Sequence, residues 1–151
     1  MKTTGIIAVI ITGVFVVLQF IPASPRNIQK DNNFSFTMQF LPSEHVAGLL
    51  KTFCFDCHSN HTEYPWYTNL QPVESFMSVH IKEGKERLNF DELATYRKRK
   101  KLTKFKSIIQ VLQENSMPLT SYKIMHGSLS KNERDSLISY FDGLILKEEK
   151  L

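Results

Sequence analysis

The residues best suited to chemistry form a Cys-x-x-Cys-His motif, CFDCH, at positions 54–58. This motif is typical of covalent haem attachment, in which each thiol forms a thioether with one haem vinyl group and the histidine binds the iron as proximal ligand. Two cysteines three positions apart lie about one helical turn from each other, which suits this attachment. We therefore predict one covalently attached haem c on Cys54 and Cys57, with His58 as an iron ligand.

Three other interpretations of the motif stay open: a thioredoxin-like redox pair, half of a zinc site, and a structural disulfide. A thioredoxin-like pair belongs beside a βαβ pattern, which this sequence lacks. A closed zinc site needs four ligands, usually in two clusters, and Cys54 and Cys57 are the chain's two cysteines. A disulfide would leave the adjacent His58 without a role. Haem attachment is therefore the favoured interpretation.

A second ligand to the iron is expected from the same region, and Met117 is the first candidate. Met117 follows a helical stretch and precedes Pro118, which restricts the backbone at this point. Its thioether would give His/Met coordination, which raises the reduction potential. His80, on the apolar side of another predicted helix, is the alternative ligand. Trp66 is predicted to line the haem pocket, because its indole can pack on haem and donate a hydrogen bond to a propionate.

Helical periodicity dominates the chain from residue 43 onward, without strand alternation or an internal repeat. Apolar residues at i, i+3, i+4 and i+7 predict one helix that leads into Cys54 from an N-cap at Ser43, and a second that begins at Pro72 and ends at Gly84. A third must end by Ser116, and a capping box at residues 130–133 begins the last. We expect an all-α, cytochrome c-like helical domain around one covalent haem.

The N-terminal stretch, residues 4–21, is apolar and uncharged over about the length that spans a bilayer. We predict an N-terminal transmembrane helix, with a cleaved secretory signal as the alternative. The expected organisation is an anchor or signal at 1–21, a linker at 22–42 and the haem domain at 43–151. Because haem c is attached outside the bacterial cytoplasmic membrane, we predict a single-pass membrane protein with its domain in the periplasm. A soluble periplasmic protein is the alternative.

Several stretches together resemble the small bacterial haem-binding domain family and, more generally, class I cytochrome c. They are CFDCHSN at 54–60, YPWY at 64–67, Gly84 with LNF at 88–90, and MPLTSY at 117–122 with His126 and Leu129. The resemblance covers about residues 49–141 and implies a membrane-anchored or secreted domain with a single haem. Family members often carry Glu-Gly-Arg where this chain has EGK at 83–85, a conservative difference that affects no ligand.

We predict electron transfer at the outer face of the cytoplasmic membrane, with a redox partner protein and no nucleic acid. The alternatives are a haem-based gas or redox sensor and a peroxidase-like haem enzyme. The sequence offers neither an output domain nor peroxidase-type acid–base residues beyond His80 and His126. The net charge is +4, and the basic run RKRKK at 97–101 could dock an acidic partner or anionic lipid. The sequence does not determine the oligomeric state.

Overall fold

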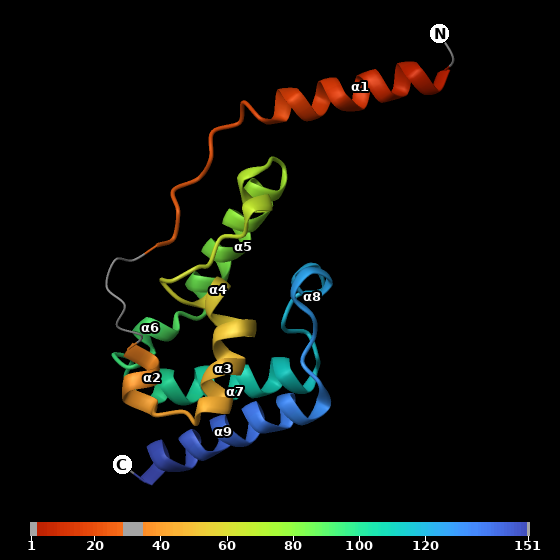
Figure 1. Ribbon diagram of the computed structural model, residues 1–151. Helices are drawn as coiled ribbons and strands as arrows, with labels where there is room; N and C mark the ends of the chain where they lie inside the picture. The colour runs from red at the N-terminus through yellow and green to blue at the C-terminus, as the bar shows by residue number, and fades with distance from the viewer. Residues whose placement is uncertain (1–2, 29–34, 151) are drawn as a thin grey trace.

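The computed structural model describes residues 3–28 and 35–150, and every regular element in these residues is a helix (Figure 1). In chain order the elements are α1 (Thr3–Leu18), α2 (Ser35–Phe40), α3 (Glu44–Leu50), the π-helix η1 (Lys51–Phe55), α4 (Asp56–His58), the 3-10 helix η2 (Trp66–Asn69), α5 (Val73–Arg87), α6 (Phe90–Leu93), α7 (Lys98–Gln113), α8 (Thr120–His126) and α9 (Lys131–Lys150). The helical periodicity of the sequence therefore predicts the class of secondary structure correctly.

The hydrophobic core is built on α7 and α9, which pack along each other, with α2, α3 and α6 against them (Figure 1). Four phenylalanines with relative exposures of 0 to 2% occupy its centre: Phe36, Phe90, Phe105 and Phe141. The rings of Phe36 and Phe90 meet edge to face with centroids 5.0 Å apart, a favourable geometry for aromatic pairs. Phe36 lies in α2, so part of the segment expected to be a linker packs in the core.

Helix α1 corrects the prediction for the N-terminal stretch. It contains 16 residues and projects away from the rest of the chain in Figure 1. Within residues 3–28 and 35–150, no helix combines the length and the apolar character needed to cross a membrane. The predicted transmembrane helix and the predicted single-pass membrane location are therefore wrong. The uncharged stretch extends to residue 21, but the helix ends at Leu18 and is too short to span a bilayer.

Helix caps follow the sequence signals at two of the predicted starts. The Ser43 hydroxyl accepts a hydrogen bond from the backbone N–H of Val46 at the start of α3 (3.3 Å). Before α9, the Ser130 N–H donates to the Glu133 carboxylate (2.7 Å), and the Glu133 N–H donates to the Ser130 hydroxyl (3.3 Å). This reciprocal pair is the predicted capping box.

Helix α5 differs from its prediction at the C-terminal end. It does not stop at Gly84 but continues to Arg87. Gly84 serves a different purpose, because a Cβ atom placed there would lie 2.5 Å from the carbonyl oxygen of Cys57. The glycine therefore allows α5 to approach the backbone of the Cys-x-x-Cys-His motif.

Candidate functional site

The motif lies where three short helical segments follow one another. Helix α3 leads into the π-helix η1, which contains Cys54, and α4 then carries Cys57 and His58. Such π-turns inside helices occur frequently at functional sites. The wider turn of η1 and the three-residue α4 place the motif against α5.

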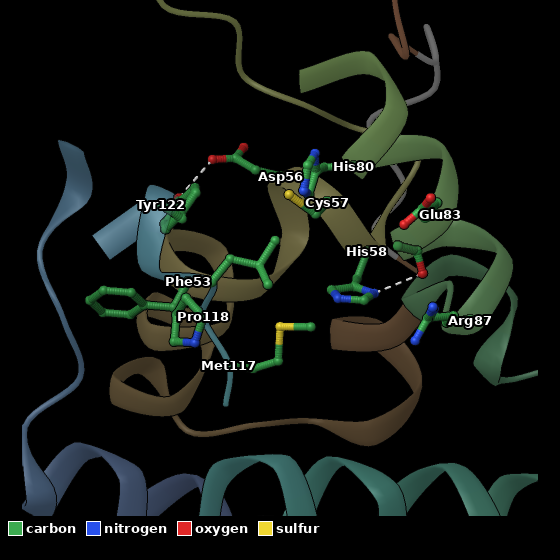
Figure 2. A pocket seen from close by; sticks show the side chains of 12 residues that line it. Phe53, Asp56, Cys57, His58, His80, Glu83, Arg87, Met117, Pro118 and Tyr122 are labelled. Atoms are coloured by element: carbon green, nitrogen blue, oxygen red, sulfur yellow. Dashed lines mark hydrogen bonds between the residues drawn. The ribbon is translucent and has the colours of Figure 1, made fainter. Parts of the chain in front are cut away.

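A cavity of about 220 Å³ opens beside the motif, between α4, α5 and the segment that leads into α8 (Figure 2). Its lining combines potential iron ligands with apolar and charged side chains: Phe53, Asp56, Cys57, His58, His80, Glu83, Gly84, Arg87, Met117, Pro118, Leu119 and Tyr122. The structure thus brings Cys57, His58, Met117 and His80 to one cavity, although Met117 lies 59 positions beyond His58 in the chain.

The imidazole of His58 is oriented by two backbone carbonyls. Its Nδ1 lies 2.9 Å from the carbonyl oxygen of Gly84 and 3.1 Å from that of Leu88. A carbonyl only accepts hydrogen bonds, so Nδ1 must carry the proton and donate it. In the neutral ring, this leaves Nε2 with a free lone pair, and burial lowers the pKa of His58, which favours the neutral ring.

The geometry of His58 suits a metal-binding histidine. In such residues, the nitrogen that does not bind the metal usually donates to a carbonyl or carboxylate, which fixes the orientation of the ring and raises its basicity. Figure 2 shows Nδ1 turned toward the Gly84 carbonyl, while the opposite edge of the ring faces the cavity and the thioether of Met117. The residues present therefore fit a haem iron held on Nε2 of His58.

The two cysteines are free thiols whose acidity is strongly suppressed. Burial, with a smaller contribution from the other thiol, raises the pKa of Cys54 to about 12. Burial and the Asp56 carboxylate raise the pKa of Cys57 to about 11. A thioredoxin-like pair needs the opposite shift, because the thiolate is its nucleophile. Cys57 lines the cavity, whereas Cys54 is partly buried against the hydrophobic core.

The zinc interpretation finds no support around this motif. Among residues 3–28 and 35–150, no group of three or more His, Cys, Asp or Glu side chains is arranged to hold a metal ion. Zinc would also need both cysteines as thiolates, and burial disfavours that state.

Both predicted candidates for the second iron ligand reach the cavity. Met117 is partly buried and is followed by the buried Pro118. His80 lies on α5, with its Nδ1 2.7 Å from the carbonyl oxygen of Phe76 and its ring packed on the Phe76 ring at a centroid distance of 4.1 Å. In Figure 2, the side chains of both Met117 and His80 are drawn at the cavity that His58 lines.

Trp66 lies elsewhere. Its side chain is 76% exposed at the start of η2 and meets the Tyr67 ring edge to face, with centroids 6.0 Å apart. The structure does not bring Trp66 to the cavity, because η2 turns this side chain toward solvent.

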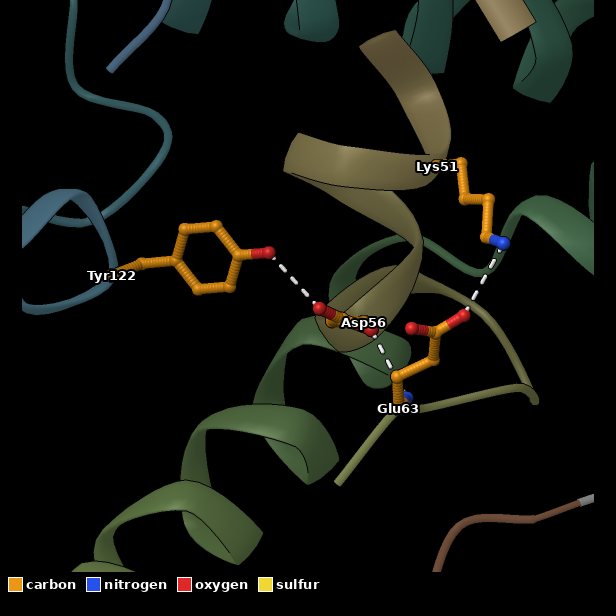
Figure 3. Close-up of polar contacts among 4 residues, drawn as sticks. All are labelled: Lys51, Asp56, Glu63 and Tyr122. Carbon is orange, nitrogen blue, oxygen red and sulfur yellow. Dashed lines mark hydrogen bonds and ion pairs between the residues drawn. The ribbon is translucent and has the colours of Figure 1, made fainter. Parts of the chain in front are cut away.

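A polar network ties the motif to α8 and to the loop after the motif (Figure 3). The carboxylate of Asp56 accepts hydrogen bonds from the Tyr122 hydroxyl (2.9 Å) and from the backbone N–H of Glu63 (3.0 Å). Burial raises the pKa of Asp56, and these two hydrogen bonds oppose that shift. Glu63 also pairs with Lys51 at 3.3 Å, although both side chains are well exposed, so this ion pair adds little.

Sequence reasoning missed Asp56 and Tyr122 as parts of the site. The signal for Asp56 was a carboxylate between the two cysteines, and that for Tyr122 was a phenol five positions after Met117. Neither signal shows that the two side chains meet, because 66 positions separate them.

Comparison with known protein families gives a match over most of the chain. A family model described as "Haem-binding domain" matches residues 13–143 of the 151, a range that contains every residue lining the cavity. No curated protein and no solved structure matches the chain.

Proposed function

The chain belongs to the haem-binding domain family, and from this premise we propose that it is a mono-haem c-type protein that carries single electrons. Cys54 and Cys57 would attach the haem through thioethers, His58 would bind the iron through Nε2, and Met117 would bind it from the other side. When bound, the haem would supply a one-electron ferric–ferrous couple.

The observation that carries this proposal is the orientation of His58. Two backbone carbonyls hold the proton on Nδ1, so Nε2 presents a lone pair to the cavity without any further rearrangement of the ring. Met117 lines the same cavity and offers the soft sulfur ligand that stabilises ferrous iron. These two residues together fit a closed, six-coordinate site, which suits electron transfer better than ligand binding.

The side chains around the ligands would keep the site rigid. Pro118 is buried and restricts the backbone beside Met117. The Tyr122–Asp56 hydrogen bond fastens α8, which follows Met117 and Pro118, to the motif that contains His58. Rigid positioning of both ligands reduces the structural change that accompanies a change of charge on the iron.

Redox titration of the purified, haem-loaded chain tests the proposal. We expect a single one-electron transition, a low-spin spectrum in both states and no binding of carbon monoxide by the reduced wild type. Immediate binding of carbon monoxide would contradict the electron-carrier function and favour the gas-sensor or peroxidase-like alternatives, because both need an open iron position.

A further inference from the structure

In the segment that follows α1, Asn27 binds both the loop after the motif and α5, and its polar groups are all engaged. Its side-chain Nδ2 donates to the carbonyl of Ser59 (2.9 Å) and to the hydroxyl of Thr62 (2.8 Å). Its Oδ1 accepts from the ammonium of Lys85 (2.6 Å). Its backbone N–H donates to the Tyr64 hydroxyl (2.9 Å), and its carbonyl accepts from the N–H of Thr62 (3.1 Å).

These contacts fall on both sides of the hydrogen bond that orients His58. Ser59 is the residue directly after His58, and Lys85 is the residue directly after Gly84, whose carbonyl accepts from His58 Nδ1. The side chain of Asn27 therefore links the Ser59 carbonyl to the Lys85 ammonium, and these belong to the residues directly after the donor and the acceptor. A change in the separation of these two residues would change the His58–Gly84 hydrogen bond.

The loop that Asn27 holds is buried. Ser59 is 0% exposed and Thr62 is 6% exposed, so water cannot readily replace the hydrogen bonds that Asn27 supplies. Within the motif and this loop, the His61 N–H donates to Ser59 Oγ and Thr62 Oγ1 donates to the Asp56 carbonyl. Asn60 ties the loop to the start of α6, through Asp91 and Asn89. The link from this loop to α5 through Asn27 is thus an additional constraint, and it comes from a distant part of the chain.

We propose that Asn27 is a positioning residue for the proximal imidazole. It acts through the Ser59 carbonyl and the Lys85 side chain on α5, holding His58 Nδ1 against the Gly84 carbonyl. This inference rests on the proposed function, because the role of the imidazole is to bind the haem iron. A strong hydrogen bond from Nδ1 makes the imidazole more electron-rich, which stabilises ferric iron and lowers the reduction potential. Loss of Asn27 should therefore raise the potential.

The test compares Asn27→Ala with a matched control, Asn69→Ala, in the full haem-loaded chain. Asn69 also binds the segment after α1, since its Oδ1 accepts from the Arg26 guanidinium, but it contacts neither Ser59 nor Lys85. We expect Asn27→Ala to raise the reduction potential and to speed the exchange of the His58 Nδ1 proton, followed by nitrogen-15 NMR, by about tenfold. Asn69→Ala should leave both quantities at their wild-type values.

Two results would overturn the inference. One is an unchanged potential and exchange rate in Asn27→Ala despite lower thermal stability, which would mean a purely structural role. The other is an equal change in both variants. Should Asn27→Ala fail to fold, Asn27→Asp keeps the Lys85 contact but cannot donate to Ser59, and it should likewise speed the exchange of the His58 Nδ1 proton. A wild type without haem would contradict the proposed function instead, while the exchange comparison would still decide the role of Asn27.

Discussion

At the scale of single residues, the site depends on which nitrogen of His58 carries the proton. The motif predicts His58 as an iron ligand, but the acceptors that fix its tautomer are backbone carbonyls of Gly84 and Leu88. Backbone groups have no signature in a sequence, so this part of the site could not be predicted. The candidate ligands could be named from the sequence, because their chemistry belongs to the side chains.

Met117 and His80 give different expectations for the second iron ligand. If Met117 is the ligand, Met117→Ala should abolish the weak near-infrared band of sulfur-to-iron charge transfer and lower the reduction potential, because a soft thioether favours ferrous iron. The variant should also bind carbon monoxide. Absorption spectroscopy and potentiometry measure these changes.

The matched control is His80→Ala, which should leave the near-infrared band intact if His80 only packs on Phe76. Loss of the low-spin spectrum in His80→Ala, with the spectrum of Met117→Ala unchanged, would identify His80 as the second iron ligand instead.

At the scale of elements, the close contact between α5 and α4 connects the fold to the site. Helix α5 supplies the Gly84 carbonyl to His58 and packs so closely that a Cβ on Gly84 would meet the Cys57 backbone. The sequence predicts α5 from its apolar stripe, yet it suggests that Gly84 ends the helix. Glycine is common both at helix ends and at close contacts, and only the tertiary structure distinguishes the two.

Substitution of Gly84 by alanine should therefore lower the free energy of unfolding, whereas the same change at an exposed helical glycine usually raises it. Gly84→Ala should destabilise the folded chain by about 2 kcal/mol, because α5 must move away from α4 to remove the overlap. It should also weaken the His58 hydrogen bond and reduce haem loading. Thermal or urea unfolding and the haem-to-protein ratio measure these effects.

Gly143→Ala is the matched control in α9, since no atom lies within 4 Å of a Cβ at that position. This change should stabilise the chain by about 0.5 to 1 kcal/mol through helix propensity. Equal stability of the two alanine variants would show that the α4–α5 contact is not tight in solution.

At the scale of the whole molecule, charge is distributed unevenly. Five exposed cations form a basic face on α7 and its N-cap: Arg97, Lys98, Arg99, Lys100 and Lys106. Among the described residues, none of the five forms an ion pair with a carboxylate, whereas the neighbouring Lys101 pairs with Glu148 at 2.8 Å. The positive end of the α7 dipole, without an acidic residue in its first turn, adds to this potential.

The same helix is linked to the site, because the ammonium of Lys104 on α7 donates to the carbonyl of Arg87, whose side chain lines the cavity. We propose that an acidic redox partner docks here, as electrostatic steering raises association rates. Arg99→Glu combined with Lys106→Glu should slow oxidation of the reduced chain by the anionic reagent hexacyanoferrate(III) roughly tenfold at low salt. Stopped-flow kinetics measures the rate.

Lys82→Glu combined with Lys131→Glu is the control, since it makes the same change in net charge outside α7. A smaller effect is expected from this pair, and high salt should remove both effects. If both double variants slowed the reaction equally, net charge alone would explain the rates, and the basic face would have no special role.

The sequence predicts the helices of the packed domain better than it predicts the long-range contacts of the segments before them. The apolar periodicity of α3, α5, α7 and α9 records burial on one side of each helix, which is a local pattern. The core position of Phe36 and the contacts of Asn27 depend on which distant residues they meet. The membrane prediction failed because it assumed one helix over the whole apolar stretch, whereas α1 ends after 16 residues.

Mass spectrometry of the chain, produced with a c-type haem attachment machinery, tests the central claim most directly. The account predicts one haem per chain that survives extraction with acidified acetone and maps to the peptide containing Cys54 and Cys57. Replacing both cysteines by serine should abolish this covalent haem. Unmodified polypeptide from the wild type, or haem that is fully removed by the extraction, would contradict covalent attachment at this motif.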